Sequence, residues 1–176
     1  MRDNGDMAAF AEYAEACSPT LFRTAFLMVG DHQLAQDLVQ EALVKTLMAW
    51  PRLNDRENLH AYTRRVIVTT SISWRRRRSF HERPLDVLPE RSGPDPAEAM
   101  VTHDAVVAAL RTVPPRQRAA IVLRYYQDLT ETQTAEAMGC SVGAVKSQVA
   151  AGLRRLRETL GPTFDHATTA DQEVTS

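Results

Sequence analysis

The chain has 176 residues and a formal net charge of −1, and 44% of its residues are apolar and 24% are charged. This length allows one domain or two small ones, and the apolar share excludes disorder throughout the chain. No apolar run approaches the roughly 18 residues of a membrane span, and the acidic N-terminus lacks the apolar stretch of a signal peptide, so we expect a cytoplasmic protein.

Glycine is sparse and no strand-like alternation persists, which predicts an all-helical chain. A first helix is expected over 6–16, and Ser18-Pro19 has the pattern of an N-cap followed by proline at the start of a second helix. A third helix is expected over 32–50, a polar loop over 51–58 and a fourth helix over 59–79.

Residues 81–97 have the composition of a linker, because they contain four prolines with acidic residues between them. This linker divides the chain into an N-terminal domain at 6–80 and a C-terminal domain at 98–160. A polar tail at 161–176 follows, and helices are expected on both sides of the Pro114-Pro115 pair.

The third helix combines a core face with a second face that mixes carboxylates and apolar side chains. That second face, the docking ridge, consists of Asp37, Gln40, Glu41, Val44, Lys45 and Met48. Apolar side chains among exposed charges favour a docking surface for a basic protein. The alternative interpretation is a wide apolar stripe in a crowded bundle. Acid–base or metal chemistry is disfavoured, because Asp37 and Glu41 have no histidine or third ligand at a similar spacing.

The fourth helix lies in a basic segment, since residues 59–83 carry seven basic side chains and one acidic side chain. Its predicted outer side, the basic face, consists of Arg64, Arg65, Val68, Ile72, Arg75 and Arg76. Guanidinium groups interleaved with apolar side chains suit an unwound nucleic-acid strand, and the loop at 51–58 could receive an unstacked base. The alternative is an ordinary solvated helix.

The segment 129–160 predicts a helix-turn-helix. Thr130 and Gln133 have the spacing of a capping box, Gly139 suits the turn, and Ser141 suits the N-cap of a long helix. The exposed side of that helix, the recognition face, consists of Ala144, Lys146, Ser147, Gln148, Ala151, Arg154 and Arg155. Small residues allow close approach to a major groove, polar groups can bond base edges, and cations can neutralise phosphates. The alternative is a helical hairpin with a solvated face.

Three segments in series resemble bacterial sigma factors of the extracytoplasmic-function (group IV) class, over about residues 10–160. The segment 37–53, DLVQEALVKTLMAWPRL, is similar to family region 2.2, which binds the β′ clamp helices of RNA polymerase. The segment 59–78, LHAYTRRVIVTTSISWRRRR, is similar to regions 2.3 and 2.4, which melt and read the promoter −10 element. The segment 114–157, PPRQRAAIVLRYYQDLTETQTAEAMGCSVGAVKSQVAAGLRRLR, is similar to region 4, which reads the −35 element.

The resemblance implies an all-α fold of two small helical domains that binds promoter DNA and core RNA polymerase, the latter through the β′ clamp helices and the β flap. It assigns polymerase binding to the docking ridge, −10 binding to the basic face with Thr69 added, and −35 binding to the recognition face. The linker would run through the polymerase active-site cleft. Members are commonly held inactive by an anti-sigma protein, which is a further candidate partner. No catalytic residue, metal or cofactor is expected in the chain itself.

The chain departs from the family at several of these positions. Members often carry Asn and Asp where this chain has Thr69 and Ser73, and Thr and Arg where it has Ala144 and Gln148. A further Arg often stands near Ala151. These changes remove hydrogen bonds and phosphate contacts, so they leave the role intact and leave the promoter sequence open.

Two other functions fit part of the sequence. A stand-alone transcription regulator would explain the helix-turn-helix but would leave the basic fourth helix without a role. A small hydrolase would use Asp37, Glu41 and a histidine, but no spacing in the chain supports such a site.

Overall fold

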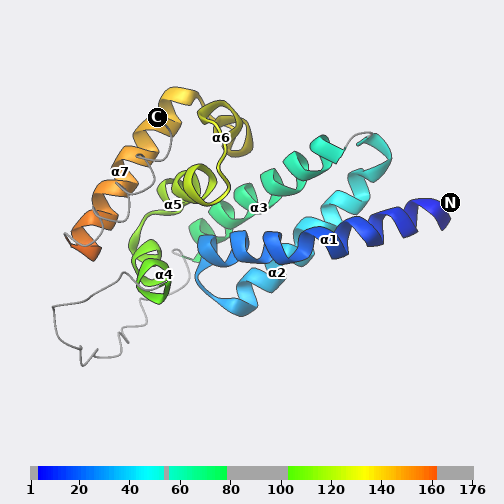
Figure 1. The fold of residues 1–176 in the computed structure, drawn as a ribbon, viewed down its shortest axis with the longest axis horizontal. Helices are drawn as coiled ribbons and strands as arrows, with labels where there is room; N and C mark the ends of the chain where they lie inside the picture. The colour runs from blue at the N-terminus through cyan, green and yellow to red at the C-terminus, as the bar shows by residue number, and fades with distance from the viewer. Residues whose placement is uncertain (1–3, 54–55, 79–102, 162–176) are drawn as a thin grey trace, which may run out of the picture.

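The computed structural model describes residues 4–53, 56–78 and 103–161, and its regular structure there is entirely helical (Figure 1). The N-terminal half contains α1 (Asn4–Val29), α2 (His32–Ala49), the short 3-10 turn η1 (Trp50–Arg52) and α3 (Arg56–Arg78). The C-terminal half contains α4 (His103–Thr112), α5 (Pro115–Ile121), the π-helical turn η2 (Val122–Tyr126), α6 (Glu131–Met138) and α7 (Val142–Leu160). The predicted all-helical fold is confirmed for this part of the chain, in which no helix is long and apolar enough to cross a membrane.

The predicted break near Ser18 is wrong, because α1 continues through Pro19 as one helix of 26 residues. The Ser18 hydroxyl does not cap a new helix but donates to the Ala14 carbonyl at 2.5 Å. Pro19 lies on the exposed side of α1, and the buried stripe continues past it from Cys17 to Leu21. The apolar contacts of that stripe outweigh the one backbone hydrogen bond that proline removes.

A chain of three hydroxyl groups joins the helices of the N-terminal half. The Tyr13 hydroxyl of α1 lies 2.8 Å from the Thr63 hydroxyl of α3, which lies 2.9 Å from the Thr46 hydroxyl of α2. Thr46 and Thr63 are fully buried, and each is also within bonding distance of a backbone carbonyl one turn earlier. Because a buried hydroxyl is costly unless it is bonded, this chain favours one relative placement of the three helices.

The two halves of the protein share one apolar core. α4 packs on α1, and both α5 and α6 pack on α3, so helices far apart in the sequence lie side by side (Figure 1). Gly30, with a φ of +70°, ends α1 at a point where a Cβ atom would lie 2.5 Å from the Cγ atom of Arg111 in α4. The expected linker, and the polar tail after Gly161, lie outside the described residues, so the boundaries of the two predicted domains remain a prediction.

The Tyr13 phenol gives the N-terminal bundle a testable pH dependence. Burial raises the pKa of Tyr13 from 10.0 to about 12, so the folded state holds this proton more tightly than the unfolded state does. The free energy of unfolding should therefore fall as the pH rises from about 10 to about 12. In Tyr13→Phe, urea unfolding followed by circular dichroism should show a shallower fall over this range.

A matched control is Tyr125→Phe, which removes a phenol that is 57% exposed and should follow the wild type. At neutral pH, Tyr13→Phe should also lower the free energy of unfolding by about 1 kcal/mol, because Thr63 loses a bonding partner. Equal slopes for Tyr13→Phe and the wild type would show that this phenol is not desolvated.

Candidate nucleic-acid and partner-binding surfaces

The helix-turn-helix of the C-terminal half has the caps that its sequence predicted. The Thr130 hydroxyl accepts a hydrogen bond from the Gln133 backbone at 3.1 Å, and the Gln133 side chain accepts one from the Thr130 backbone at 2.9 Å. Gly139 ends α6 in the left-handed conformation with a φ of +63°. Ser141 caps α7, since its hydroxyl accepts from the Ala144 backbone at 3.1 Å. The capping box, the turn and the long second helix are thus confirmed.

The inner side of α7 is held close to α5, which turns the recognition face outward. Val145 and Leu156 are buried, and a Cβ atom on Gly152 would lie 2.5 Å from the Cδ1 atom of Ile121. Glycine at this position therefore allows the two helices to approach closely. The sequence pattern identified the apolar stripe of α7 but not the role of Gly152.

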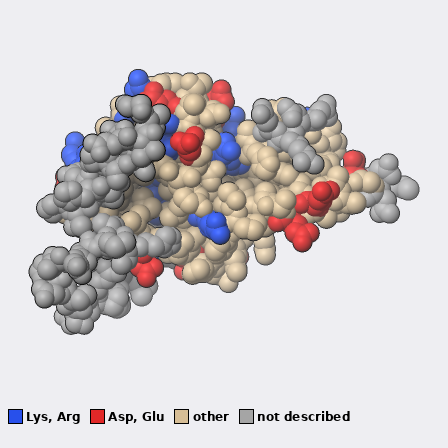
Figure 2. All heavy atoms as spheres, viewed as in Figure 1, with Lys and Arg blue, Asp and Glu red and all other residues tan. Residues whose placement is uncertain are grey.

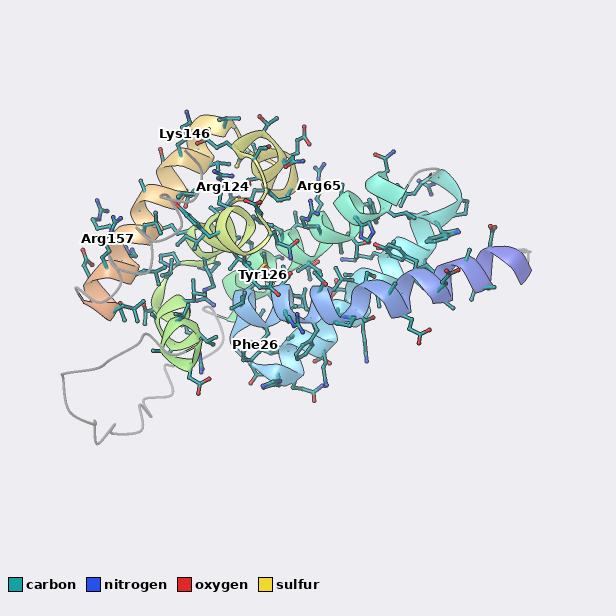
Figure 3. All side chains as sticks on the ribbon, in the orientation of Figure 1. Phe26, Arg65, Arg124, Tyr126, Lys146 and Arg157 are labelled. Atoms are coloured by element: carbon teal, nitrogen blue, oxygen red, sulfur yellow. The ribbon has the colours of Figure 1, made fainter. Side chains whose placement is uncertain are left out.

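The recognition face is only partly exposed. Lys146, Ser147, Arg154 and Arg155 are exposed, whereas Ala144, Gln148 and Ala151 are half-buried. The Lys146 ammonium group forms an ion pair with Glu131 of α6, with 3.4 Å between Nζ and Oε2. Figure 3 places Lys146 at the N-terminal end of α7, beside α6. This end combines small side chains with a cation, as expected of a helix that enters a groove.

The docking ridge of α2 is present as the sequence predicted. Asp37, Gln40 and Lys45 are exposed and Glu41 is half-buried. The ridge also contains two large apolar side chains, Val44 and Met48, which are 57% and 65% exposed. Gln33 donates to the Asp37 carboxylate at 3.0 Å, and Lys45 bonds Glu41 at 2.6 Å. Exposed apolar groups framed by ordered charges are typical of a protein-binding surface.

The basic face of α3 differs from the prediction. Val68, expected on the outside, is fully buried, and Ile72 is half-buried against the core. Arg65 is exposed, as is Thr69, whose hydroxyl donates to the Arg65 carbonyl at 2.8 Å. The prediction of an open outer face failed because helices of the C-terminal half cover part of the basic face. The periodicity of α3 alone gives no information on where those helices pack.

Arg64 lines a cavity of about 190 Å³ between α1 and α3, together with Thr24 and with Gln127, the residue that follows η2. Burial lowers the pKa of its guanidinium, which carries its charge at neutral pH all the same. The side chains of Arg75 and Arg76, the remaining members of the basic face, lie outside the described part of the structure.

The expected polar loop at 51–58 is shorter than predicted. Its start is the 3-10 turn η1 (Trp50–Arg52), and α3 already begins at Arg56. Residues 54–55 lie outside the described residues, so the structure does not test whether this loop receives a base.

Sequence reasoning missed the buried polar groups that position these surfaces. Arg118 of α5 is fully buried, and the sequence analysis did not single it out. Thr46 and Thr63 were not separated from their exposed neighbours. Arg118 stands three positions before the apolar pair Ile121–Val122 and three after Pro115. This spacing places it on the inner side of a short helix, and it was the signal from which its burial could have been predicted.

Charged groups are unevenly distributed over the surface. Figure 2 shows acidic side chains gathered over the N-terminal part of α1, and basic side chains over α3 and the half formed by α5–α7. The basic side also carries carboxylates, among them Glu131. A phosphate backbone would therefore be attracted to this side of the molecule rather than to the chain as a whole.

Comparisons with known proteins identify the family to which the chain belongs. Residues 13–81 match the family described as Sigma-70 region 2, and residues 103–156 match that described as Sigma-70, region 4. The RNA polymerase sigma-E factor of Streptomyces avermitilis is 37% identical over 157 residues, which cover 89% of this chain and 88% of that protein. The ECF RNA polymerase sigma factor SigL of Mycobacterium tuberculosis is 30% identical over 145 residues, which cover 80% and 82% of the two chains.

A solved structure has the same fold. The sigma factor RpoE from Bartonella quintana, crystallised in complex with the anti-sigma factor NepR, superimposes with a TM-score of 0.67 at 23% identity, over 88% of this chain and 98% of that one. The two family matches and the similarity to sigma factors over most of the chain define a promoter-specificity protein of bacterial transcription. The chain belongs to the sigma-70 family, in its extracytoplasmic-function class, and it directs promoter-specific transcription initiation.

The N-cap of α7 provides a test of how the recognition helix is held. Ser141→Ala should lower the free energy of unfolding by about 1 kcal/mol, because the Ala144 N–H loses its acceptor. Ser147→Ala, at an exposed position in the second turn of the same helix, is the control and should stay within about 0.5 kcal/mol of the wild type. Thermal unfolding of both variants is measured by calorimetry. Equal unfolding midpoints for Ser141→Ala and the wild type would show that the Ser141 cap does not stabilise α7.

Proposed function

We propose that the three surfaces described above divide the work of transcription initiation. The docking ridge of α2 binds the clamp helices of the RNA polymerase β′ subunit, and the polymerase supplies all the chemistry of nucleotide addition. The observation that carries this proposal is an apolar and acidic ridge, with Val44 and Met48 exposed, on the same molecule as two helices with exposed basic side chains. A DNA-binding regulator that acted alone would need no such ridge.

The recognition face of α7 reads the −35 element in the major groove. Lys146, Arg154 and Arg155 neutralise phosphates, and Ser147 reaches base edges. Ala144, Gln148 and Ala151, half-buried in the isolated chain, contribute shape and one amide. Because the family's usual Thr and Arg are absent here, we expect a −35 preference that differs from that of common members.

The exposed side of α3 holds the −10 element after it unwinds. Arg64, Arg65, Thr69, Arg75 and Arg76 are the proposed contacts, with the cations on the backbone and the hydroxyl on a base. Extruding a base costs a few kcal/mol, which phosphate neutralisation and base capture offset. Val68 and Ile72 can take part only where the C-terminal half does not cover them.

The partners of the protein follow from these roles. They are core RNA polymerase, contacted at the β′ clamp helices and the β flap, and promoter DNA. An anti-sigma protein is a further partner, since the related RpoE was crystallised with one. We place the protein in the cytoplasm, where polymerase and promoters are, and assign it no enzymatic activity of its own. The linker at 81–97 would connect the two DNA contacts and raise their joint affinity through effective concentration.

Run-off transcription with core polymerase and a promoter library tests the proposal as a whole. Specific start sites that appear only when the protein is added are the expected result, with sequence shared at two separated elements upstream of each start. Binding to duplex DNA without polymerase, together with no specific initiation, would instead establish a stand-alone regulator.

Two variants separate the polymerase contact from the −10 contact. Asp37→Arg reverses a charge on the docking ridge and should weaken binding to core polymerase by about tenfold or more, measured by fluorescence anisotropy. The pair Arg75→Ala and Arg76→Ala should leave that affinity unchanged and abolish open-complex formation, measured by permanganate reactivity. Each variant controls for the other, and an unaltered affinity in the first or an unaltered open complex in the second removes that assignment.

A further inference from the structure

A cleft of about 520 Å³ lies where the end of α1 and the start of α2 meet α4 and the end of η2. The residues that line it belong to none of the three surfaces described above. Its volume falls within the range of about 300–1,000 Å³ that is usual for the sites of small ligands. The cleft is therefore large enough to hold a molecule of one or two rings.

One wall of the cleft consists of three aromatic rings. The rings of Phe22 and Phe26, one helical turn apart on α1, are stacked with 6.3 Å between their centroids and 14° between their planes. His32, the first residue of α2, has its ring centroid 4.5 Å from that of Phe26 and 5.8 Å from that of Phe22. Both phenyl rings are only half-buried, so this aromatic wall offers ring surface on which a flat ligand can stack.

The C-terminal half contributes a fourth aromatic side chain. Tyr126, the last residue of η2, lines the cleft and is 43% exposed, whereas Val122 and Leu123 of the same turn are buried. Figure 3 shows Tyr126 and Phe26 on neighbouring elements at the junction of the two halves. A ring that stacks on the aromatic wall would therefore meet a second aromatic surface at Tyr126.

The charged side chains of the cleft favour an anion. Arg23 of α1 and Arg111 of α4 are exposed and supply two guanidinium groups, against the one carboxylate of Asp104. Asp104 lies in the first turn of α4, where the helix N-terminus stabilises its charge. The stem of Arg111 lies across Gly30, because a Cβ atom there would be 2.5 and 2.7 Å from the Cγ and Cδ atoms of Arg111. A guanidinium group on a stem held in this way loses little freedom when it binds an oxyanion at two points.

We propose that this cleft is a binding site for a small, planar aromatic anion. The ring of the ligand lies between the aromatic wall and Tyr126, and its anionic group is bound by Arg111 and Arg23. An aromatic carboxylate and a nucleoside monophosphate share this chemistry. Such a site is additional to the proposed contacts with DNA and polymerase and does not depend on them.

Calorimetric titration of the full-length chain with two probes tests the proposal, without polymerase or DNA. The probes are indole-3-acetate, an aromatic carboxylate, and adenosine 5′-monophosphate. At least one of them should bind with a Kd between about 10 µM and 1 mM, the range expected of ligands of this size. The probe that binds more tightly identifies which of the two kinds of anion the cleft takes.

Each probe has two matched control ligands, which carry its ring alone or its anion alone. Indole and acetate are the controls for the carboxylate, and adenosine and inorganic phosphate are the controls for the nucleotide. Each control should bind at least about tenfold more weakly than its probe, because it makes only one of the two kinds of contact.

Two pairs of variants locate the bound probe in the cleft. Arg111→Met keeps an unbranched side chain but removes the guanidinium group, and it should weaken binding about tenfold. Its control, Arg116→Met, changes an exposed position on α5 outside the cleft and should match the wild type. Tyr126→Leu removes the second aromatic surface and should weaken binding about fivefold, whereas Tyr125→Leu, at the adjacent exposed tyrosine, should have no effect. If Arg111→Met fails to fold, Arg23→Met replaces it.

The bound probe should also stabilise the contact between the two halves, because α1 and α2 line one side of the cleft and α4 and η2 line the other. The unfolding midpoint measured by scanning calorimetry should rise by about 3–5 °C at a probe concentration of ten times Kd. An unchanged midpoint at that concentration would contradict a site shared by both halves.

Three results of the titrations would overturn the proposed site. They are no binding of either probe, equal binding of the ring alone or the anion alone, and unchanged affinity in a folded arginine variant or in Tyr126→Leu. Because the titrations contain neither polymerase nor DNA, their failure leaves the proposed role in initiation standing. The absence of specific run-off transcription would likewise leave the ligand site standing.

Discussion

One guanidinium group joins parts of the chain that are 90 residues apart. Arg118 is fully buried between the end of α1 and the end of α4, and it bonds the carbonyls that these helices leave without partners. The relative position of the two halves depends on this contact, since α5 carries Arg118 and also packs on α3. A buried guanidinium requires acceptors at defined positions, so Arg118 favours one relative placement of the two halves. Its net contribution to stability is small all the same.

The helices of the N-terminal half are held in one fixed relation by buried hydroxyl groups. α2 carries the docking ridge and α3 carries the basic face, and the hydroxyls of Thr46 and Thr63 link them at 2.9 Å. The bundle therefore fixes the position of α2, which we propose to bind polymerase, relative to α3, which we propose to bind the −10 element.

The sequence predicted local features well because they depend on neighbouring residues. The capping box at Thr130, the left-handed Gly139 and the exposed Val44 and Met48 all follow from patterns within one or two helical turns. The continuous α1 was missed because packing along its whole length overrides a local proline signal. The burial of Val68 was missed for a related reason, since the periodicity of α3 cannot report a helix that arrives from 40 or more residues later in the chain.

The ion pair between Lys146 and Glu131 bears on how ionic strength affects the protein. A cation that already has a carboxylate partner releases fewer condensed counterions when it moves to a phosphate than a free cation would. The dependence of duplex binding on salt should thus be shallower than the number of basic groups on α7 implies. Contact between α7 and duplex DNA should then persist over a wider range of ionic strength than a helix with only unpaired cations would allow.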